Sequence, residues 1–343
     1  MILNTTIPKT SLEWDSVENA VEGQEALKGF NKHNYVVQIE NSFFKIRVPI
    51  PNSDKMDIRL LPEYIVQDYL HKHGFKVPSV IYVSNSPAYQ VHEFLQATLV
   101  DEIAPRGKRL PSHFISDVVN LISNLQEQSS DWLLPYLENW VAIGDCNSFF
   151  DRVANFNYSL YAKYSLEYND LFFQLGIPSN TRQILEGKRK KLSRRSFALC
   201  HCDIHRKNCL IRNDTTYFID WELALFGDPA YDIGVHLSKI EYQSDEEEEF
   251  LELLSKRTTK TFLNGIIEDI QMYRDHEDVK AILISAIRYH KVIAMQKNNY
   301  KLVEMLLTKY RKKLFKAEPI LGNKVLGFNE LKKIFTNYNC KAG

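Results

Sequence analysis

Residues 200–214 read CHCDIHRKNCLIRND and are followed by TTYFIDWE at 215–222. The apolar runs at 209–211 and 216–219 flank Arg-Asn-Asp-Thr, which has the composition of a turn. This pattern predicts a β-hairpin that folds back near residue 214. In antiparallel pairing about that point, Asn208 and Asp220 lie roughly opposite each other.

The polar side chains of this hairpin predict a site for a hard cation. Asn208 offers an amide oxygen and Asp220 offers a carboxylate, while Asp203 lies on the loop that enters the hairpin. Mg²⁺ prefers oxygen ligands and usually keeps several waters. We therefore expect Asn208 and Asp220 to hold Mg²⁺ and Asp203 to face the hydroxyl group of a substrate.

A zinc centre is the alternative that the crowded cysteines raise. Structural zinc sites usually combine a CxxC pair with a second pair of ligands further along the chain. Here the spacing is C-x-C-x6-C, and Cys146 and Cys340 are isolated. Cysteines that pack as small apolar side chains around a loop explain the cluster more simply.

Composition narrows the functional class. The chain has 343 residues, with 43 Lys+Arg and 43 Asp+Glu, so a nucleic-acid partner that needs a basic surface is not expected. No apolar run approaches the ~18 residues of a membrane-spanning helix, and the first residues lack the pattern of a secretory signal. Five cysteines, three of them crowded together, do not suit a disulfide framework. We predict a cytoplasmic protein with no membrane partner, and no feature indicates an oligomeric state.

The order of the expected elements predicts an α+β fold with two lobes. Residues 33–48 have the pattern of a β-hairpin, residues 60–73 that of a helix, and 77–83 and 88–95 those of strands. Alternation along the second hairpin strand places Phe44, Ile46 and Val48 on one face and Lys45 and Arg47 on the other. Further helices are expected at 113–127, 148–175, 179–191, 245–270, 278–296 and 299–316. We expect a small lobe at 1–95 and a larger, mainly helical lobe at 96–343.

Three motifs resemble those of one enzyme family. HCDIHRKN (201–208) matches the pattern H-x-D-x-x-x-x-N, FIDWE (218–222) is similar to a metal-binding segment, and GDPAYDIG (227–234) is similar to the stretch that follows it. Together they resemble the aminoglycoside phosphotransferase and choline kinase group, small-molecule relatives of protein kinases. The resemblance implies a bilobal, protein-kinase-like fold with a small β-rich lobe that carries one helix.

The resemblance also implies roles for individual residues. Asp203 would orient or deprotonate the attacking hydroxyl, and Asn208 and Asp220 would hold Mg²⁺ and through it the phosphates of ATP. His201 and Asp232 would support the catalytic loop. The nucleotide would meet the residues Arg47, Glu63, Glu93, Phe94 and Leu95. Of these, Arg47 resembles the residue that grips the α and β phosphates, Glu63 resembles its helix partner, and 91–95 resemble the hinge that meets adenine.

Two positions of the nucleotide site stay open. Lys45 lies on the same face as Arg47 and is the alternative phosphate ligand. The phosphate loop is expected near 26–37, where Gly29 is the only glycine and Asn31 is a possible substitute for others.

The predicted activity is transfer of the γ-phosphate of ATP to a hydroxyl of a small polar molecule. An aminoglycoside or another hydroxylated antibiotic is the preferred acceptor, which predicts a role in antibiotic resistance. Choline, ethanolamine, another amino alcohol or a sugar is the alternative, and a non-catalytic nucleotide-binding pseudokinase is a second alternative. Carboxylates that suit a polycation are Asp131, Glu138, Asp145, Asp151 and Glu241. Aromatic residues that suit a quaternary ammonium are Trp132, Tyr136, Trp140 and Tyr242.

Overall fold

The computed structural model describes residues 12–22, 24–27, 32–39, 42–51, 56–263 and 265–338. The chain divides into two compact units. Unit 1 consists of Met1–Leu121, Asp203–Leu225 and Tyr242–Phe250, and unit 2 consists of Ile122–Cys202, Phe226–Glu241 and Leu251–Gly343. Unit 1 therefore includes residues of both predicted lobes, 1–95 and 96–343, and that division into lobes stays a prediction.

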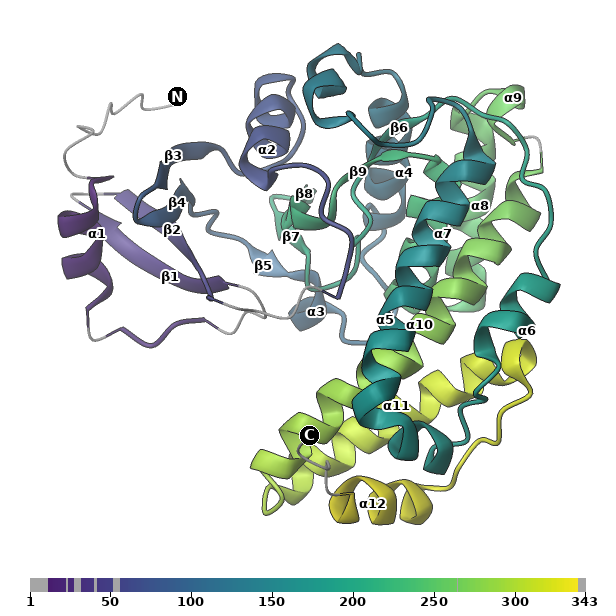
Figure 1. Ribbon diagram of the computed structural model, residues 1–343. Helices are drawn as coiled ribbons and strands as arrows, with labels where there is room; N and C mark the ends of the chain where they lie inside the picture. Colours follow the sequence, from purple (N-terminus) through teal and green to yellow (C-terminus); the bar gives the residue numbers. More distant parts are fainter. Residues whose placement is uncertain are drawn as a thin grey trace. The chain divides into compact units, whose positions relative to one another are not determined.

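A four-stranded antiparallel sheet forms the first part of unit 1 (Figure 1). Its strands, in the order β1-β2-β4-β3, are β1 (Lys32–Ile39), β2 (Ser42–Pro49), β4 (Ala88–Glu93) and β3 (Val80–Asn85). The pairing of β1 with β2, from Lys32↔Pro49 to Ile39↔Ser42, confirms the hairpin predicted at 33–48. The turn at Glu40 and Asn41 lies outside the described residues.

The core of this sheet explains why β2 presents two cations on its other face. Phe44 and Ile46 are buried with Val37 and Val91, and helix α1 (Trp14–Val21) packs on the same cluster through Val17. Because side chains alternate along a strand, Lys45 and Arg47 lie opposite this core, as predicted.

Helix α2 (Glu63–Lys72) follows β2 and confirms the helix predicted at 60–73. Pro62 immediately precedes the helix, and Gly74 follows its cap residue His73 with a φ of +81°. The proline has no N–H to lose at a helix start, and glycine adopts positive φ without a steric penalty. Glu63 is thereby the first residue of the helix.

The motif of residues 200–222 forms a second hairpin in unit 1. Strand β7 (Cys209–Arg212) pairs with β8 (Thr215–Phe218) and with β5 (Thr98–Leu99) in a three-stranded sheet. The predicted register was wrong by one residue. The turn residues Asn213 and Asp214 have φ of 50° and 51°, the positive values of a two-residue type I′ turn, so the hairpin is centred between them. The backbone oxygen of Asn208 consequently accepts a hydrogen bond from Ile219, not from Asp220.

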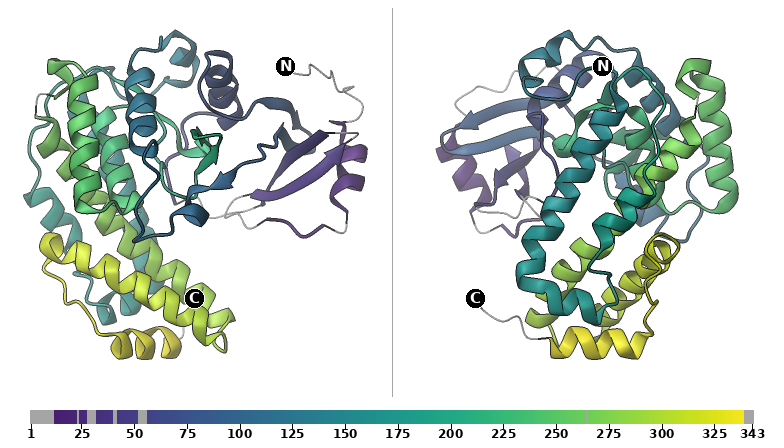
Figure 2. Two further views of the ribbon diagram at one scale, coloured as in Figure 1. Left: turned by 180° about the vertical axis from the view of Figure 1, so that it is seen from behind. Right: turned by 45° about the vertical axis from the view of Figure 1, so that its right-hand side comes forward.

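Unit 2 is mainly helical. Its longest helix, α10 (Ile266–Met295), lies beside α5 (Cys146–Gln174), α7 (Pro229–Ile240) and α11 (Tyr300–Leu321), as both figures of the whole chain show (Figures 1 and 2). The other elements of the helical part are α6 (Thr181–Gly187), α9 (Lys260–Leu263), α12 (Phe328–Asn337), the 3₁₀-helix η2 (Asp131–Tyr136) and strand β6 (Ala198–Cys200). Two further helices contain a limit between the units, α4 (Phe114–Gln126) and α8 (Ser244–Arg257), while α3 (Val100–Ile103) belongs to unit 1. No helix among the described residues has the length and apolarity that a membrane crossing needs.

Two predicted helices are divided differently in the structure. The helix expected at 245–270 ends at Arg257, and α10 begins after Gly265 and runs through the gap that was expected between 270 and 278. Gly265, the N-cap residue of α10, has a φ of +61°, which glycine adopts without a steric penalty. The polar residues at 271–278 contain no glycine or proline, so nothing in the backbone interrupts α10 there.

Candidate active site

Arg47 on β2 contacts Glu63, the first residue of α2, and Asp220, which follows β8. Its Nη1 donates to Glu63 Oε1, and its Nη2 donates to Asp220 Oδ1 at 2.8 Å. Both Arg47 and Glu63 are buried. Burial opposes ionisation of Glu63, but the positive charges of Arg47 and Lys32 outweigh burial and hold the pKa of Glu63 below its usual value. The structure thus brings together Arg47, Glu63 and Asp220, three of the residues that the sequence singled out.

Lys45 does not replace Arg47 in this network. It forms no hydrogen bond or ion pair with a described residue, and its Cα pairs with that of His92 across β2 and β4. Burial, followed by repulsion from Arg47, lowers the pKa of Lys45 to about 8. Burial and the same arginine lower the pKa of His92 to about 3, so its ring is neutral at pH 7.

Asp220 has a backbone conformation that directs its carboxylate outward from the end of β8. Its φ of 67° and ψ of 62° are left-handed, a conformation that aspartate tolerates better than most residues. The next residue, Trp221, is fully buried and donates its indole N–H to Phe218 O at 3.2 Å. The buried tryptophan fixes the turn, while a third of the Asp220 side chain stays exposed.

Asn208 is bonded directly to Asp203. Its Nδ2 donates to the backbone oxygen of Asp203 at 3.0 Å and to Asp203 Oδ2 at 2.9 Å. Its backbone N–H donates to His205 O at 2.8 Å. Within the described chain no hydrogen bond uses Asn208 Oδ1, so this oxygen is available to a cation.

His205 also lies close to the predicted catalytic carboxylate, although no role was predicted for it. Its Nδ1 accepts the backbone N–H of Lys207 at 3.1 Å, which in a neutral ring places the proton on Nε2. That Nε2 lies 3.6 Å from Asp203 Oδ2. The tight loop 203–208 therefore holds Asp203 between an amide and an imidazole.

Three residues that the sequence did not single out complete the charged network of unit 1. Glu222 Oε1 accepts a hydrogen bond from Arg59 Nη2 at 3.0 Å, and its Oε2 forms an ion pair with Arg59 Nη1 at 2.8 Å. Lys32 pairs with Glu63 Oε2 and lies 3.7 Å from Glu222 Oε2. Glu222 stands two residues after Asp220, which is the only sequence signal that pointed to it. No spacing rule connects Lys32 or Arg59 to the motifs.

The donor atoms of this region suit a hard cation. Ligand atoms of Glu63, Asp220 and Glu222 all lie within 4.8 Å of one another. Glu63 and Glu222 each contact two cationic side chains, whereas Asp220 is partly exposed and has Arg47 as its only ion-pair partner among the described residues. The carboxylate of Asp220 and the amide oxygen of Asn208 are the oxygen ligands that Mg²⁺ prefers. The residues present fit the predicted metal.

The zinc alternative finds no support in the described part of the chain. No cluster of potential metal ligands there contains a cysteine. Cys200, Cys202 and Cys209 are buried and free, and burial raises the pKa of each thiol above its usual value. They pack as neutral, small apolar side chains.

The predicted hinge at 91–95 covers the last three residues of β4 and the two residues that follow it. The side chain of Glu93 is occupied, because its Oε2 accepts hydrogen bonds from the N–H and hydroxyl of Ser79 at 3.0 and 3.1 Å. Phe94 and Leu95 come next in the chain, and no hydrogen bond between described residues uses the backbone of Leu95. A base would therefore meet this backbone and not the Glu93 carboxylate. The predicted phosphate-loop residues Gly29 and Asn31 lie outside the described residues.

In unit 2, Asp232 binds backbone N–H groups from its position on a helix. It lies on α7, and its carboxylate accepts the backbone N–H of His201 at 3.0 Å and of Cys202 at 2.7 Å. Burial raises the pKa of Asp232, while His201 and these hydrogen bonds oppose the shift. The two carboxylate hydrogen bonds fix the chain immediately before Asp203.

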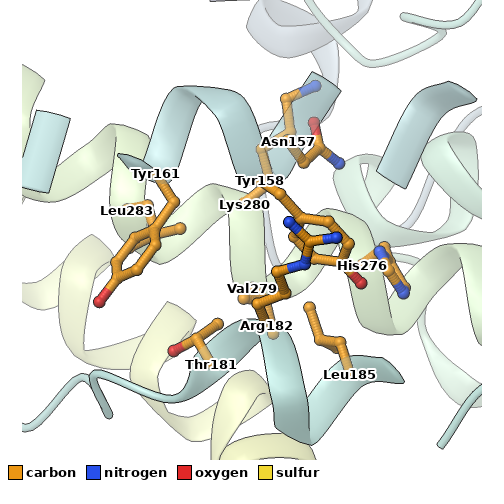
Figure 3. Close-up of a pocket in the computed structure, with 10 residues that line it drawn as sticks. All are labelled: Asn157, Tyr158, Tyr161, Thr181, Arg182, Leu185, His276, Val279, Lys280 and Leu283. Atoms are coloured by element: carbon orange, nitrogen blue, oxygen red, sulfur yellow. The ribbon is translucent and has the colours of Figure 1, made fainter. Parts of the chain in front are cut away.

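A cavity in unit 2 lies among α5, α6 and α10 (Figure 3). Its volume is about 10 Å³, which is room for roughly one water molecule. Neither side-chain atom of the buried Asn157 has a hydrogen-bond partner among the described residues, so a water suits this place. The cavity is too small for a sugar or an amino alcohol.

Residues 22–262 match the family described as the phosphotransferase enzyme family. The chain belongs to this family. It is therefore an ATP-dependent small-molecule kinase, as the sequence predicted. No curated protein sequence matches the chain.

Solved structures share the fold of this phosphotransferase at low sequence identity. An ethanolamine kinase of Plasmodium vivax is 15% identical, with 89% of this chain and 86% of that chain covered and a TM-score of 0.56. LicA in complex with AMP is 15% identical, with 89% and 96% covered and a TM-score of 0.54; LicA is a choline kinase of Streptococcus pneumoniae. The gentamicin complex of APH(2")-IIa is 13% identical, with 92% and 97% covered and a TM-score of 0.52. These similarities confirm the predicted α+β, protein-kinase-like fold.

Proposed function

We propose that this phosphotransferase moves the γ-phosphate of ATP to a hydroxyl group of a small polar molecule. The observation that carries the proposal is the position of Arg47, whose guanidinium bonds both Glu63 and Asp220. A cation for the phosphates and a carboxylate for the metal thereby lie side by side in unit 1. Phosphoryl transfer depends on this kind of positioning and charge stabilisation more than on covalent chemistry by the protein.

Each group has a defined task in this proposal. Asp203 accepts a hydrogen bond from the acceptor hydroxyl and takes its proton, while Asn208 and His205 hold the carboxylate in place. Asp220 and Asn208 would hold Mg²⁺, which when bound offsets charge on the phosphates. Arg47, kept in position by Glu63, binds the α and β phosphates. The backbone at Phe94 and Leu95 contacts the base.

The preferred acceptor is an aminoglycoside or another hydroxylated antibiotic, and choline or ethanolamine is the second candidate. Two of the five acidic residues that suit a polycation already have partners. Asp145 accepts hydrogen bonds from the N–H and hydroxyl of Ser148 at 3.1 and 2.6 Å, and Asp151 pairs with Arg189 at 2.8 Å. Glu241 also interacts with another part of the chain, so that Asp131 and Glu138 are the two described carboxylates left for the polycation. An ethanolamine kinase and a choline kinase are among the proteins of similar fold, which supports the second candidate.

In an aromatic cage for a quaternary ammonium, Trp140 would offer only the ring face that Arg152 does not cover. Its indole N–H donates to Phe226 O at 2.8 Å, and the guanidinium of Arg152 already covers its ring at 5.6 Å from the centroid. A cation-binding ring must have a face open to the ligand. Because Arg152 already covers one face of Trp140, we rank choline as the second candidate acceptor.

A screen with γ-labelled ATP tests the proposal. The acceptors are aminoglycosides, other hydroxylated antibiotics, choline, ethanolamine and sugars, and Asp203→Ala is the negative control. We expect label on one class of hydroxyl compound and none with the variant. Label on choline alone would show that choline, and not an antibiotic, is the acceptor. Tight ATP binding without transfer to any of these classes would favour the pseudokinase alternative.

A further inference from the structure

We propose that Lys32 is a second phosphate-binding cation of the nucleotide site, beside Arg47. The proposal rests on the proposed function. Lys32 is the first residue of β1, and its side chain is only 14% exposed. Its ammonium pairs with the same carboxylate, that of Glu63, which also binds Arg47.

Neither carboxylate near Lys32 needs it as a counterion. Glu63 already has a guanidinium partner in Arg47, and Glu222 has a two-point contact with Arg59, one hydrogen bond and one ion pair. The distance of 3.7 Å between Lys32 Nζ and Glu222 Oε2 exceeds a hydrogen bond. An ammonium has three N–H donors, and Lys32 uses one of them, toward Glu63, within the described chain.

The balance of charges shows when Lys32 becomes available. Three cations (Lys32, Arg47 and Arg59) form ion pairs with three carboxylates (Glu63, Asp220 and Glu222), and the nearby Lys45 adds a fourth positive charge without an ion pair. If Asp220 serves a metal ion, two carboxylates remain for the three cations. Arg59 is fixed by its two-point contact with Glu222. The surplus positive charge therefore lies on Lys32 and on Nη2 of Arg47, where an anionic phosphate group compensates it.

Binding of nucleotides that differ in phosphate number tests this role, without any acceptor. We expect Lys32→Met to weaken the binding of ATP and ADP about tenfold, the effect of one lost charge-assisted hydrogen bond, and to leave adenosine within about twofold. Lys32→Arg should restore most of the affinity. Lys72→Met is the matched control, because Lys72 is exposed on α2 and pairs only with Asp68 among the described residues. This control should bind all three compounds as the wild type does.

A double-mutant cycle separates direct contact from an indirect effect through Arg47. If Lys32 touches phosphate, Lys32→Met still weakens ADP binding in an Arg47→Met background. Disappearance of the effect in that background, unchanged ADP affinity of Lys32→Met, or an equal loss for adenosine would overturn the inference. Thermal unfolding checks each variant, and Lys32→Gln replaces Lys32→Met if the latter does not fold. A wild-type protein that binds neither ATP nor ADP would instead contradict the proposed function.

Discussion

Asp203 owes its position to its immediate neighbours in the chain. Asn208 donates hydrogen bonds to the backbone oxygen of Asp203 and to its carboxylate. The imidazole Nε2 of His205 lies 3.6 Å from the same carboxylate oxygen, Oδ2. Because these contacts span at most five residues, the motif H-x-D-x-x-x-x-N contains nearly all that is needed to build the loop. Substitution of Asp203 removes its carboxylate but leaves the hydrogen bond from Asn208 to its backbone oxygen. Substitution of Asn208 removes both hydrogen bonds, so we expect it to disturb the loop more.

We expect Asp203→Ala to reduce the rate of phosphoryl transfer by at least about 100-fold, because general-base help is typically worth 10²–10⁴-fold. Nucleotide affinity should stay near that of the wild type, since Arg47 and Asp220 are untouched. Steady-state kinetics and calorimetry measure the two quantities. Asp203→Asn, which keeps the size of the side chain but not its basicity, should lose a similar factor. Near-normal turnover of both variants would remove Asp203 from the chemistry.

Burial of the charged Lys45 side chain lowers the free energy of unfolding of the protein. The pKa of Lys45 falls from 10.5 to about 8, first through burial and then through Arg47, so the folded protein binds fewer protons than the unfolded chain between these pH values. Stability therefore rises with pH across that window, and the penalty is complete below about pH 8. We expect Lys45→Met to stabilise the protein at pH 7.

The stabilising effect of Lys45→Met should shrink as the pH rises from 8 toward 10.5. Urea unfolding of the variant and the wild type at pH 7 and pH 10 measures the difference. Lys72→Met, an exposed lysine on α2, provides the comparison. A Lys45→Met effect that is the same at both pH values would contradict the lowered pKa.

At the scale of single elements, the β7–β8 hairpin shows how a turn sets the register. Asn213 and Asp214 both have positive φ, and the two-residue turn pairs Arg212 with Thr215. Asp220 then follows two residues after the last residue of β8, in a left-handed conformation of its own. The carboxylate owes its direction to this kink and to the buried Trp221, not to strand pairing.

We expect Asp214→Gly to stabilise the protein by about 0.5–1 kcal/mol, because Asn-Gly is the preferred pair of a type I′ turn and glycine adopts positive φ without strain. Chemical denaturation of the variant measures the effect. Thr215→Gly, which places glycine one residue later within β8, should destabilise instead. Destabilisation by Asp214→Gly would contradict the turn type.

The motif GDPAYDIG is explained by the packing of unit 2. A Cβ on Gly227 would lie 2.0 Å from the ring of Phe149, and one on Gly234 would lie 2.9 Å from Cβ of Tyr273. Asp228 caps α7 by accepting the N–H of Ala230 at 3.0 Å. Both glycines are therefore required by close approach, and the motif positions α7 and its Asp232.

At the scale of the whole molecule, unit 2 contains a buried ionic network of its own. Nη1 of Arg195 donates to both carboxylate oxygens of Asp228, at 3.0 and 2.9 Å, and Nη2 pairs with Asp269. Burial raises the pKa of Asp228 despite this arginine. The three residues come from segments 33 and 74 positions apart, so the network joins the chain before β6 to α7 and α10.

We expect Arg195→Met to destabilise the protein by about 3–5 kcal/mol, because it leaves two buried carboxylates without their cation. Urea unfolding followed by circular dichroism measures this loss. Arg182→Met is the control, since Arg182 is exposed and pairs with Glu186 one helical turn away; it should change stability little. A small effect of Arg195→Met would show that the network contributes little to folding.

Sequence alone determined the parts of this protein that depend on short-range patterns. Period-two alternation placed Arg47 opposite the core of β2, and helix signals placed Glu63 near the start of α2. The spacing of Asp203 and Asn208 fixed a loop in which the two side chains bond. These features follow from backbone geometry and hydrogen bonds over a few residues, which a sequence displays directly.

Only the tertiary structure decided which distant charges meet. The contacts of Arg47 with Asp220 and of Arg59 with Glu222 join residues 173 and 163 positions apart, and Lys32 reaches Glu63 across 31. No periodicity encodes such pairs, because they depend on how separate segments pack. The same applies to the hairpin register, which one turn conformation shifted by a residue. The sequence could name the groups of a phosphotransferase, but the balance of three cations and three carboxylates arises only when the chain has folded.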